Sequence, residues 1–402
     1  MKVHDSRLKA PVLIVADAPK ASLAALFLVF VFALSLPPKW ASLHFAGLLL
    51  VFSVGLARRS DWHTPAMRTF LLCTALWLIP VLVTAGLQHA LGVASATEWK
   101  DLPVLVLRML GIGLGIIVLV QRGLLTLYSA TFALLCALSV HVGAGLVDLF
   151  AEPSASLTTW RELRINGLVF NPNPFGMFMA ITAILAAGLL RNPSQRPVLW
   201  VVLIAALFCV WVSGSRGAIL TTIAGFAVLF PPNNRQRLFF YLGCGALMAV
   251  VYLYVTLYLP ALYSASDSER MVAFSFSLEK IRMAPWLGWG IGAYEHFPDR
   301  VGPNAPHNMW LDLVVSSGLV ALLGGLLSAG LLVVRLYRQS QPAAQLALAV
   351  FVAALVAGTL EYSILDSTHF RGVWVLVVAL ACCTLNERCG AQNGAVLGGK
   401  KA

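Results

Sequence analysis

The stretch Pro303-Asn304-Ala305-Pro306-His307-Asn308-Met309-Trp310-Leu311-Asp312 joins a long polar loop to an apolar helix. Proline suits the first helical turn, because the N–H that it lacks would be unbonded there anyway. We therefore expect Pro306 in the first turn and His307 at the outward end of that helix. A helix N-terminus disfavours positive charge, so His307 should be neutral there and able to accept a proton.

The composition around this stretch is that of a membrane protein. Of the 402 residues, 59% are hydrophobic and 11% are charged, and the mean hydropathy is +0.83. A soluble domain carries about 25% charged residues. The net charge of +11 does not indicate nucleic acid, because the basic residues fall in short loops between apolar runs. We predict an all-α polytopic integral membrane protein whose partners include membrane lipids and no nucleic acid.

Twelve apolar runs are long enough to cross a bilayer as helices. They lie at about 21–36, 41–57, 67–89, 103–121, 123–149, 174–190, 197–213, 216–230, 237–260, 307–334, 343–364 and 371–386. Open strands would leave backbone groups unpaired in lipid, so helices are expected throughout. Residues 1–402 are therefore predicted to form a single transmembrane domain of about 12 helices.

The charge distribution predicts which loops face the cytoplasm. With the N-terminus inside, the inner segments hold 17 of the 28 basic residues and four of the 17 acidic residues. Cytoplasmic loops are enriched in Lys and Arg, so both termini are predicted to be cytoplasmic, including the tail 387–402. The two long polar loops, 150–173 and 261–306, then face outward.

Three arginines of the outward segments are candidates for binding an anion. Arg216 opens a helix after a tight turn, where a cation opposes the helix dipole by about 0.3–1 kcal/mol unless an anion lies nearby. A contact with a lipid phosphate is the alternative for Arg216. Arg161 and Arg164 are three residues apart, so on a helix they would share a face and suit a phosphate-rich ligand.

Other parts of the outward loops have simpler expected roles. Asn171 and Asn173 should cap the helix that follows them. Apolar residues at helical spacing between Ser268 and Met283 predict an amphipathic helix at the outer membrane surface, in which Arg270 is open between a ligand contact and a surface charge. Glycines at 288, 290 and 292 indicate a tight turn between tryptophans rather than a nucleotide loop.

A further polar group lies between the last two spans. It consists of Glu361, Asp366, His369 and Arg371. The sequence shows no metal-ligand spacing that would join His307 to His369. We therefore predict no metal and no other cofactor.

Several motifs, in one order, resemble those of the O-antigen ligase family. Asn-Gly-Leu-Val-Phe-Asn-Pro-Asn-Pro-Phe-Gly at 166–176 is similar to the family's signature run. It is followed by Ser-Gly-Ser-Arg-Gly-Ala at 213–218, Glu269-Arg270, Gly288-Trp289-Gly290 and His307-Asn308. The resemblance covers about residues 150–320. It implies a place in the bacterial inner membrane, within the O-antigen ligase/polymerase superfamily, and an active site facing the periplasm.

The resemblance also implies an activity, that of a metal-independent, inverting glycosyltransferase of lipopolysaccharide biosynthesis. Such an enzyme moves a glycan from undecaprenyl pyrophosphate onto a sugar hydroxyl of lipid A–core. By position, His307 matches the proposed catalytic histidine and Arg216 the essential arginine. The remaining arginines expected to bind donor pyrophosphate are Arg161, Arg164 and Arg270. The residues expected to shape the site are Asn171, Asn173, Asn308 and Gly214.

Three alternatives stay open. An O-antigen polymerase would use the same donor with a second lipid-linked glycan as acceptor. A protein O-oligosaccharyltransferase is favoured less, because no large extracytoplasmic domain follows the last span. A lipid-linked glycan transporter would place charges at mid-membrane and break helices in paired halves, whereas the charges singled out here cluster at the outer helix ends.

Overall fold

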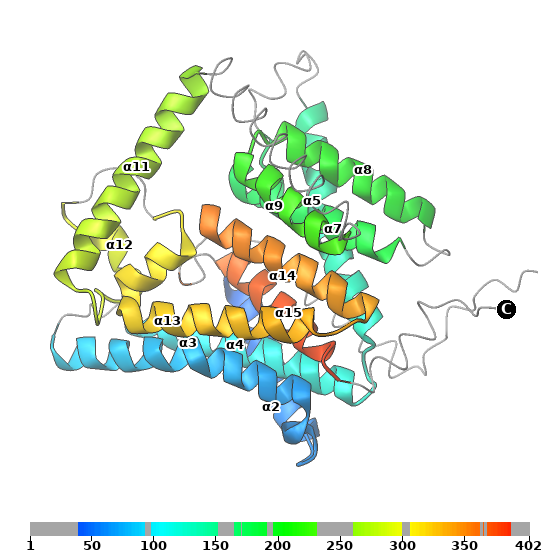
Figure 1. The fold of residues 1–402 in the computed structure, drawn as a ribbon, viewed down its shortest axis with the longest axis horizontal. Helices are drawn as coiled ribbons and strands as arrows, with labels where there is room; N and C mark the ends of the chain where they lie inside the picture. The colour runs from blue at the N-terminus through cyan, green and yellow to red at the C-terminus, as the bar shows by residue number, and fades with distance from the viewer. Residues whose placement is uncertain are drawn as a thin grey trace, which may run out of the picture.

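The computed structural model describes residues 39–92, 98–151, 165–169, 171–190, 196–230, 260–299, 306–361, 365 and 368–386. In these ranges the chain is helical and contains no strand, which confirms the all-α prediction for them (Figure 1). The α-helices are α2 (Lys39–Leu56), α3 (Pro65–Ala90), α4 (Glu98–Gln121), α5 (Leu127–Phe150), α7 (Pro172–Leu189), α8 (Arg196–Val212), α9 (Arg216–Leu229), α11 (Pro260–Met283), α12 (Ala293–His296), α13 (Met309–Tyr337), α14 (Pro342–Leu360) and α15 (Thr368–Cys383). Two single turns of 3-10 helix lie at Asp61–His63 and Gly167–Val169.

Six of these helices are long and apolar enough to cross a membrane. They are Pro65–Ala90, Leu102–Gln121, Leu127–Phe150, Pro172–Leu189, Met309–Tyr337 and Pro342–Leu360, and shorter apolar helices lie at Ala46–Leu56, Arg196–Val212, Arg216–Leu229 and Phe370–Cys383. The chain is therefore a multi-pass membrane protein. The total of twelve spans stays a prediction, since the runs 21–36 and 237–260 lie outside the described residues, as does the tail 387–402.

Side-chain caps fix several helix starts. Thr64 accepts a hydrogen bond from the N–H of Met67 at 3.3 Å, and Pro65 follows at the first helical position. Thr126 caps α5 in the same way, accepting from the N–H of Ser129 at 3.0 Å. Such a cap satisfies an N–H that a helix start leaves unbonded and contributes about 1 kcal/mol. These starts lie close to those predicted from the apolar runs.

The helices bring their termini to two ends of the bundle. Contacts among Asn173, Arg270, His307 and Glu361 define one of them, called here the Glu361 end. At the other, the Arg335 end, Arg335 donates to the Thr69 hydroxyl, and Arg122 pairs with Asp61 at 2.6 Å. The candidate site residues of the long polar loops thus lie at the Glu361 end, and the short basic loops lie at the Arg335 end.

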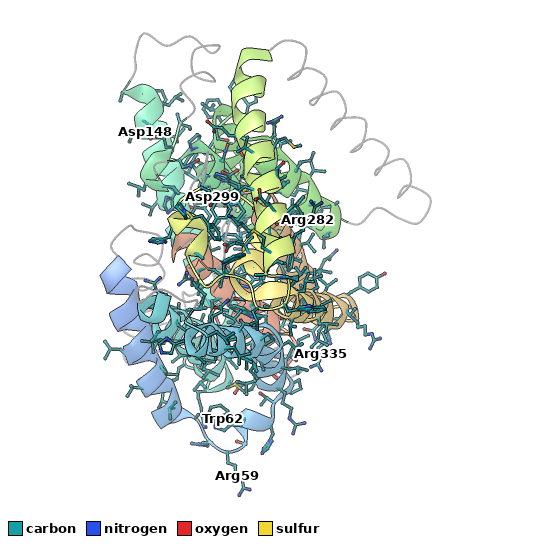
Figure 2. All side chains as sticks on the ribbon, turned by 90° about the vertical axis from the view of Figure 1, so that its left-hand side faces the viewer. Arg59, Trp62, Asp148, Arg282, Asp299 and Arg335 are labelled. Carbon is teal, nitrogen blue, oxygen red and sulfur yellow. The ribbon has the colours of Figure 1, made fainter. Side chains whose placement is uncertain are left out.

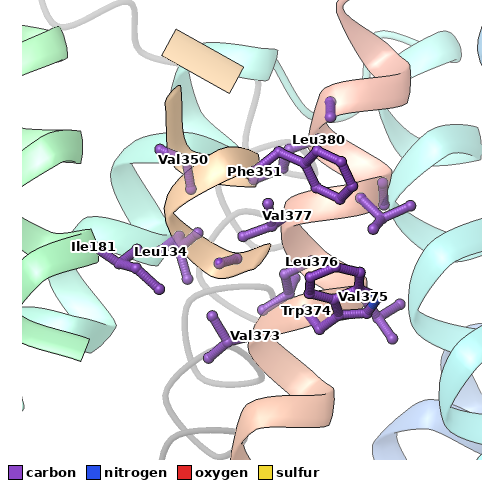
Figure 3. Packing of buried hydrophobic residues seen from close by; sticks show 14 of the residues in the cluster. Leu134, Ile181, Val350, Phe351, Val373, Trp374, Val375, Leu376, Val377 and Leu380 are labelled. Carbon is purple, nitrogen blue, oxygen red and sulfur yellow. The ribbon is translucent and has the colours of Figure 1, made fainter. Parts of the chain in front are cut away.

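The last apolar helix, α15, lies at the centre of the packing. Its residues from Val373 to Cys383 are buried on every side, as expected for a helix that is apolar all round. Figure 3 shows Trp374 and Val377 of α15 beside Phe351 of α14, and the rings of Phe351 and Trp374 have centroids 5.3 Å apart. This core holds α14, and with it Glu361, in a fixed place.

Helix α13 folds back on itself at Gly318, whose backbone is non-helical (φ 78°, ψ 178°). A Cβ added to Gly325 would lie 3.1 Å from Leu313 Cδ2 and 3.4 Å from Trp310 Cζ3. In a straight helix those residues would be about 18 Å and about 22 Å away along the axis. Residues 309–317 therefore form a short arm that returns along the long arm, 319–337.

Backbone from the loop after α11 fills the break in α13. The N–H groups of Trp289 and Gly290 donate to the carbonyls of Val315 and Ser316, at 2.7 and 2.9 Å. The buried side chain of Gln88, on α3, donates to the carbonyl of Ser316 at 3.0 Å and to that of the loop residue 287 at 2.6 Å. Because unpaired buried backbone groups are costly, these bonds make the sharp reversal possible.

Two glycines are required at this junction. Gly288 (φ 68°) and Gly318 have left-handed backbone, and a Cβ at Gly318 would lie 2.0 Å from the carbonyl oxygen of Trp286. A Cβ at Gly288 would lie 2.6 Å from the backbone of Ser316. The glycine-rich turn at 288–292 is thus a packing element of the break.

The predicted start of this helix was wrong. Pro306 precedes the helix and His307 is outside it, because Asn308 is the N-cap and accepts from the N–H groups of Trp310 and Leu311 at 2.9 and 3.1 Å. A side-chain cap one residue after His307 stabilises the later start. The apolar part that continues along the bundle begins only after Gly318.

Helix α11 begins earlier than predicted, at Pro260 rather than near Ser268. Of its apolar residues, Met271 and Leu278 are exposed, whereas Ala273, Ser277 and Lys280 are buried against the rest of the chain. The side that packs on the protein therefore combines small and polar residues with the ring of Phe276. Its position at a membrane surface stays a prediction.

Candidate functional site

Glu361 is the centre of a polar cluster at the Glu361 end. Its Oε1 lies 3.2 Å from Nδ1 of His307 and accepts from Nδ2 of Asn173 at 3.2 Å, while its Oε2 pairs with Nη2 of Arg270 at 2.5 Å. The Glu361 side chain is 2% exposed, against 28% for His307 and 25% for Arg270. The nearly buried carboxylate is thus held by three partners. Two of them, His307 and Arg270, keep about a quarter of their side chains exposed.

The position of Glu361 on its helix explains why it needs these partners. It follows the last residue of α14, where a negative charge opposes the helix dipole by about 0.3–1 kcal/mol. Burial also removes the carboxylate from water, and this desolvation is unfavourable for a charged group that has no partner. Arg270 and Asn173 offset both costs, so they stabilise the carboxylate beside His307.

His307 has left-handed backbone (φ 50°), unlike any other non-glycine residue that the structure describes. Histidine tolerates this region better than most residues, but it is still uncommon and costs about 1 kcal/mol or more. The conformation turns the chain between Pro306 and the Asn308 cap. It places the ring at the free tip of the short arm, against Glu361.

Asn171 and Asn173 have different roles at the start of α7. Asn171 is the N-cap and accepts from the N–H of Asn173 at 3.0 Å. Asn173 lies inside the helix, and its side-chain amide donates a hydrogen bond to Glu361. Asn171 thus fixes the helix start from which Asn173 reaches the cluster.

Arg216 is the first residue of α9, as the sequence predicted. Ser215 is the N-cap and accepts from the N–H of Ala218 at 3.2 Å, and the Ser213 hydroxyl accepts from the N–H of Ser215 at 3.3 Å. Gly214 supplies the left-handed backbone of this turn (φ 64°). The Ser-Gly-Ser run therefore directs the start of α9 toward the polar cluster.

The start of α9 touches the end of α14. A Cβ added to Gly217 would lie 3.5 Å from Cβ of Leu360, the residue before Glu361. Arg216 at a positive helix end and Glu361 at a negative one are each unfavourable on their own helix. Because the two ends meet, each charge lies beside the helix end of opposite sign. The junction therefore makes both placements tolerable.

Helix α11 is tied to the following segment by Lys280. Its Nζ pairs with Asp299 Oδ2 at 2.6 Å and lies 4.9 and 4.7 Å from the ring centroids of Phe276 and Phe297. The hydrogen bond from Lys280 lowers the pKa of Asp299. Figure 2 shows Asp299 beside α11, with Arg282 of the same helix nearby. This contact fixes the helix that carries Arg270.

Not every predicted site residue can be placed. Arg161 and Arg164 lie outside the described residues, and so do Asp366 and the side chain of His369. Asn173, Arg270 and His307 meet at Glu361. Asn308 caps the helix that follows His307, and Arg216 begins α9, whose next residue packs beside Leu360. Within the described part of the chain, no group of three or more His, Cys, Asp or Glu side chains is suited to holding a metal ion.

Glu361 is the site residue that the sequence interpretation missed. The sequence alone groups it with other polar residues between the last two spans. The sequence feature that could have indicated its role is the position of an acid near the end of the apolar run 343–364. An ionisable residue in such a run is energetically unfavourable and is usually paired with another polar group. The partner is 54 positions away along the chain, in a loop that the apolar pattern does not connect to that helix.

Comparison with known families agrees with this geometry. Residues 199–326 match a family model described as O-Antigen ligase, and this segment includes Arg216, Arg270 and His307. No curated protein is significantly similar to the chain. The match supports glycosyl transfer at a membrane, of the ligase or polymerase type. Residues 199–326 are therefore similar to the O-antigen ligase family, as the order of the motifs indicated.

Proposed function

We propose that the protein is an O-antigen ligase that transfers a glycan from undecaprenyl pyrophosphate to a sugar hydroxyl of lipid A–core. The observation that carries the proposal is the contact between His307, which lies in the segment that matches the family model, and the buried carboxylate of Glu361. We place the Glu361 end on the periplasmic face of the bacterial inner membrane, with both termini cytoplasmic. The bias of basic residues toward the other end supports this orientation.

His307 is the general base of the proposed reaction. Glu361 accepts a hydrogen bond from the N–H group at Nδ1 of His307. This bond fixes the ring and leaves the lone pair of Nε2 to act as the base. The acceptor hydroxyl oxygen bonds to the anomeric carbon while its proton passes to Nε2. The bond from that carbon to the pyrophosphate oxygen breaks and its electrons stay with undecaprenyl pyrophosphate. A single displacement of this kind inverts the anomeric carbon.

Arginines stabilise the leaving group without a metal in this proposal. Arg216 lies at the start of α9, where backbone N–H groups also point outward from the helix end. Arg270 keeps a quarter of its side chain exposed beside Glu361, so it can reach a ligand without leaving its partner. Arg161 and Arg164 are assigned to the same role from their spacing. Fixed cations act most strongly on charge that develops in the transition state.

A transporter of lipid-linked glycans is the candidate of another class. Two observations favour it in part, since α13 is broken and Arg108 is buried within α4. However, transporters break helices in pairs around a central site. Among the described helices, α13 alone has non-helical backbone inside it, and that break is filled by protein backbone. The polar cluster lies at helix ends, which favours chemistry there.

The experiment that tests the function supplies purified protein with an undecaprenyl-pyrophosphate-linked glycan and one of two acceptors. Lipid A–core plus glycan as product supports the ligase. A lengthened lipid-linked glycan, formed without lipid A–core, would identify a polymerase, and glycosylated protein would identify an oligosaccharyltransferase. Movement of the donor across proteoliposomes without any transfer would overturn the enzyme assignment.

A further inference from the structure

A hydrogen bond between Trp310 and Thr359 joins the first turn of α13 to the last turn of α14. The indole Nε1 of Trp310 donates to the hydroxyl of Thr359 at 2.9 Å. Trp310 lies three residues after His307. Thr359 lies two residues before Glu361. The bond therefore connects the two backbone segments that carry the base and its buried carboxylate, close to both.

The hydroxyl of Thr359 is oriented by its own helix. It donates its proton to the carbonyl of Leu355 at 2.8 Å, one turn earlier in α14. A hydroxyl has one proton to donate and two lone pairs with which to accept. Because the proton is used within α14, the oxygen acts as an acceptor and faces Trp310 in a fixed direction. Thr359 thus offers the indole N–H a prepared partner.

Packing holds the rest of this turn in place. A Cβ added to Gly325, on the long arm of α13, would lie 3.4 Å from Cζ3 of the Trp310 indole. The neighbouring side chain of Met309 is buried, and its sulfur occupies the place that a Cβ on Gly358 would take. The first turn of α13 is therefore seated between α14 and the long arm, with the indole hydrogen-bonded to α14.

The placement of this turn determines where the His307 ring lies. His307 is outside the helix, in left-handed backbone, with its ring nitrogen 3.2 Å from Glu361. Asn308 caps the same turn by accepting from the N–H of Trp310 at 2.9 Å, so a displacement of Trp310 also displaces the residue next to His307. A misplacement of about 1 Å can lower the rate of a catalysed reaction about 10²-fold. The position of the indole therefore bears on catalysis through the geometry of the base.

We propose that Trp310 and Thr359 are positioning residues of the reaction, and that their hydrogen bond keeps His307 in register with Glu361. The inference rests on the proposed function for its effect on glycan transfer. Because the bond acts on the geometry of the base, its loss should slow the chemical step more than it weakens binding of the donor. Neither side chain has to touch the substrate for this effect.

Thr359→Val removes the acceptor and keeps the shape of the side chain. The indole N–H is then left without its partner, which is unfavourable enough to displace the ring. The assay uses purified protein, an undecaprenyl-pyrophosphate-linked glycan and lipid A–core. In it, kcat should fall about tenfold and KM for the donor should stay within about twofold. Thr359→Ser restores the hydroxyl and should return kcat to within about threefold of the wild type.

Thr131→Val, on α5, is a matched control. The hydroxyl of Thr131 donates to the carbonyl of Leu127 at 2.8 Å, the same bond within a helix that Thr359 makes. Both threonines are partly buried in apolar helices. The control therefore loses the bond within the helix but no bond from Trp310, and kcat should stay within about twofold of the wild type.

Trp310→Phe gives a second test through non-additivity. Phenylalanine keeps an aromatic ring and loses the indole N–H. If both substitutions remove one hydrogen bond, the double variant Trp310→Phe/Thr359→Val should lose less than about twofold in kcat beyond Trp310→Phe alone. Losses that multiply would overturn the proposal. Equal losses in Thr359→Val and Thr131→Val, or no recovery by Thr359→Ser, would overturn it as well.

Hydrogen–deuterium exchange of backbone amides separates this inference from the proposed function, because it needs no substrate. Thr359→Val should raise exchange in peptides covering 308–317 about three- to tenfold and leave 319–337 unchanged, whereas Thr131→Val should change neither. This result supports the positioning bond even if no glycan transfer occurs. Unchanged exchange at 308–317 would reject it even if the protein is an active ligase. If Thr359→Val does not fold, Trp310→Phe takes its place in both measurements.

Discussion

Glu361 and His307 meet through Oε1 and Nδ1 at 3.2 Å, although one ends a long apolar helix and the other lies in a loop before a different helix. The carboxylate is nearly buried and the ring is partly open. A buried acceptor on one ring nitrogen orients the ring and leaves the other nitrogen for a different partner. The pair has the arrangement expected of a base and the residue that positions it.

Glu361→Gln should lower kcat by about 10²-fold or more while the protein still folds. Glutamine keeps the shape and can still accept one hydrogen bond, but it removes the charge that fixes His307 and holds Arg270. The measurement is transfer rate with saturating donor, with Glu279→Gln, an exposed acid on α11, as the control. A rate within threefold of the wild type would show that Glu361 does not position the base.

Arg216→Ala should reduce transfer by about 10²- to 10³-fold, the effect of losing one donor that stabilises developing charge. Arg216→Lys should recover little, because lysine keeps the charge and loses the planar fork. Donor binding and turnover are measured separately, with Arg282→Lys on the exposed side of α11 as the control. Full recovery by lysine would mean that charge alone matters at this position.

Gly318→Ala should destabilise the protein strongly. The added Cβ would lie 2.0 Å from the Trp286 carbonyl oxygen, at a left-handed backbone position. Gly330→Ala, on the long arm of the same helix, meets nothing within 4 Å and should leave stability unchanged or raise it by about 0.5–1 kcal/mol. Thermal unfolding in detergent checks both, and equal midpoints for the two variants would contradict the hairpin form of α13.

The Lys280–Asp299 pair should make no contribution to pH dependence between pH 5 and 8. The folded-state pKa of Asp299 is lowered by the hydrogen bond from Lys280, so the pair stabilises the protein above about pH 4 and is lost as pH falls further. The thermal midpoints of wild type and Asp299→Asn should therefore differ by a constant amount from pH 5 to 8. A difference that changes within this range would contradict the assignment.

The sequence predicted many of the described helices for physical reasons that hold locally, and the roles of the site residues stay predictions. Apolar runs and N-caps such as Thr64 and Ser215 are local signals, and so is the placement of Arg216 at a helix start. The order of short motifs indicated the family that residues 199–326 resemble. These features do not depend on how distant segments meet.

The missed features all depend on distant contacts. The reversal at Gly318 requires backbone from 285–290 and the side chain of Gln88, which no periodicity connects to α13. The start of that helix moved because the Asn308 cap outweighs the preference of proline for a first turn. The sequence shows Glu361 as a polar residue but does not pair it with His307, since only the packing of α14 brings the two together.

His307→Asn tests the central claim most directly. Asparagine tolerates left-handed backbone, so the variant should fold, whereas its amide cannot accept the proton of a hydroxyl. The measurement is single-turnover transfer from an undecaprenyl-linked glycan to lipid A–core, with donor binding followed in parallel and His296→Asn, an exposed histidine of α12, as the control. We predict that His307→Asn binds donor normally and loses about 10²- to 10⁴-fold in rate, while His296→Asn behaves as wild type. Near wild-type transfer by His307→Asn would contradict the assignment of His307 as the base.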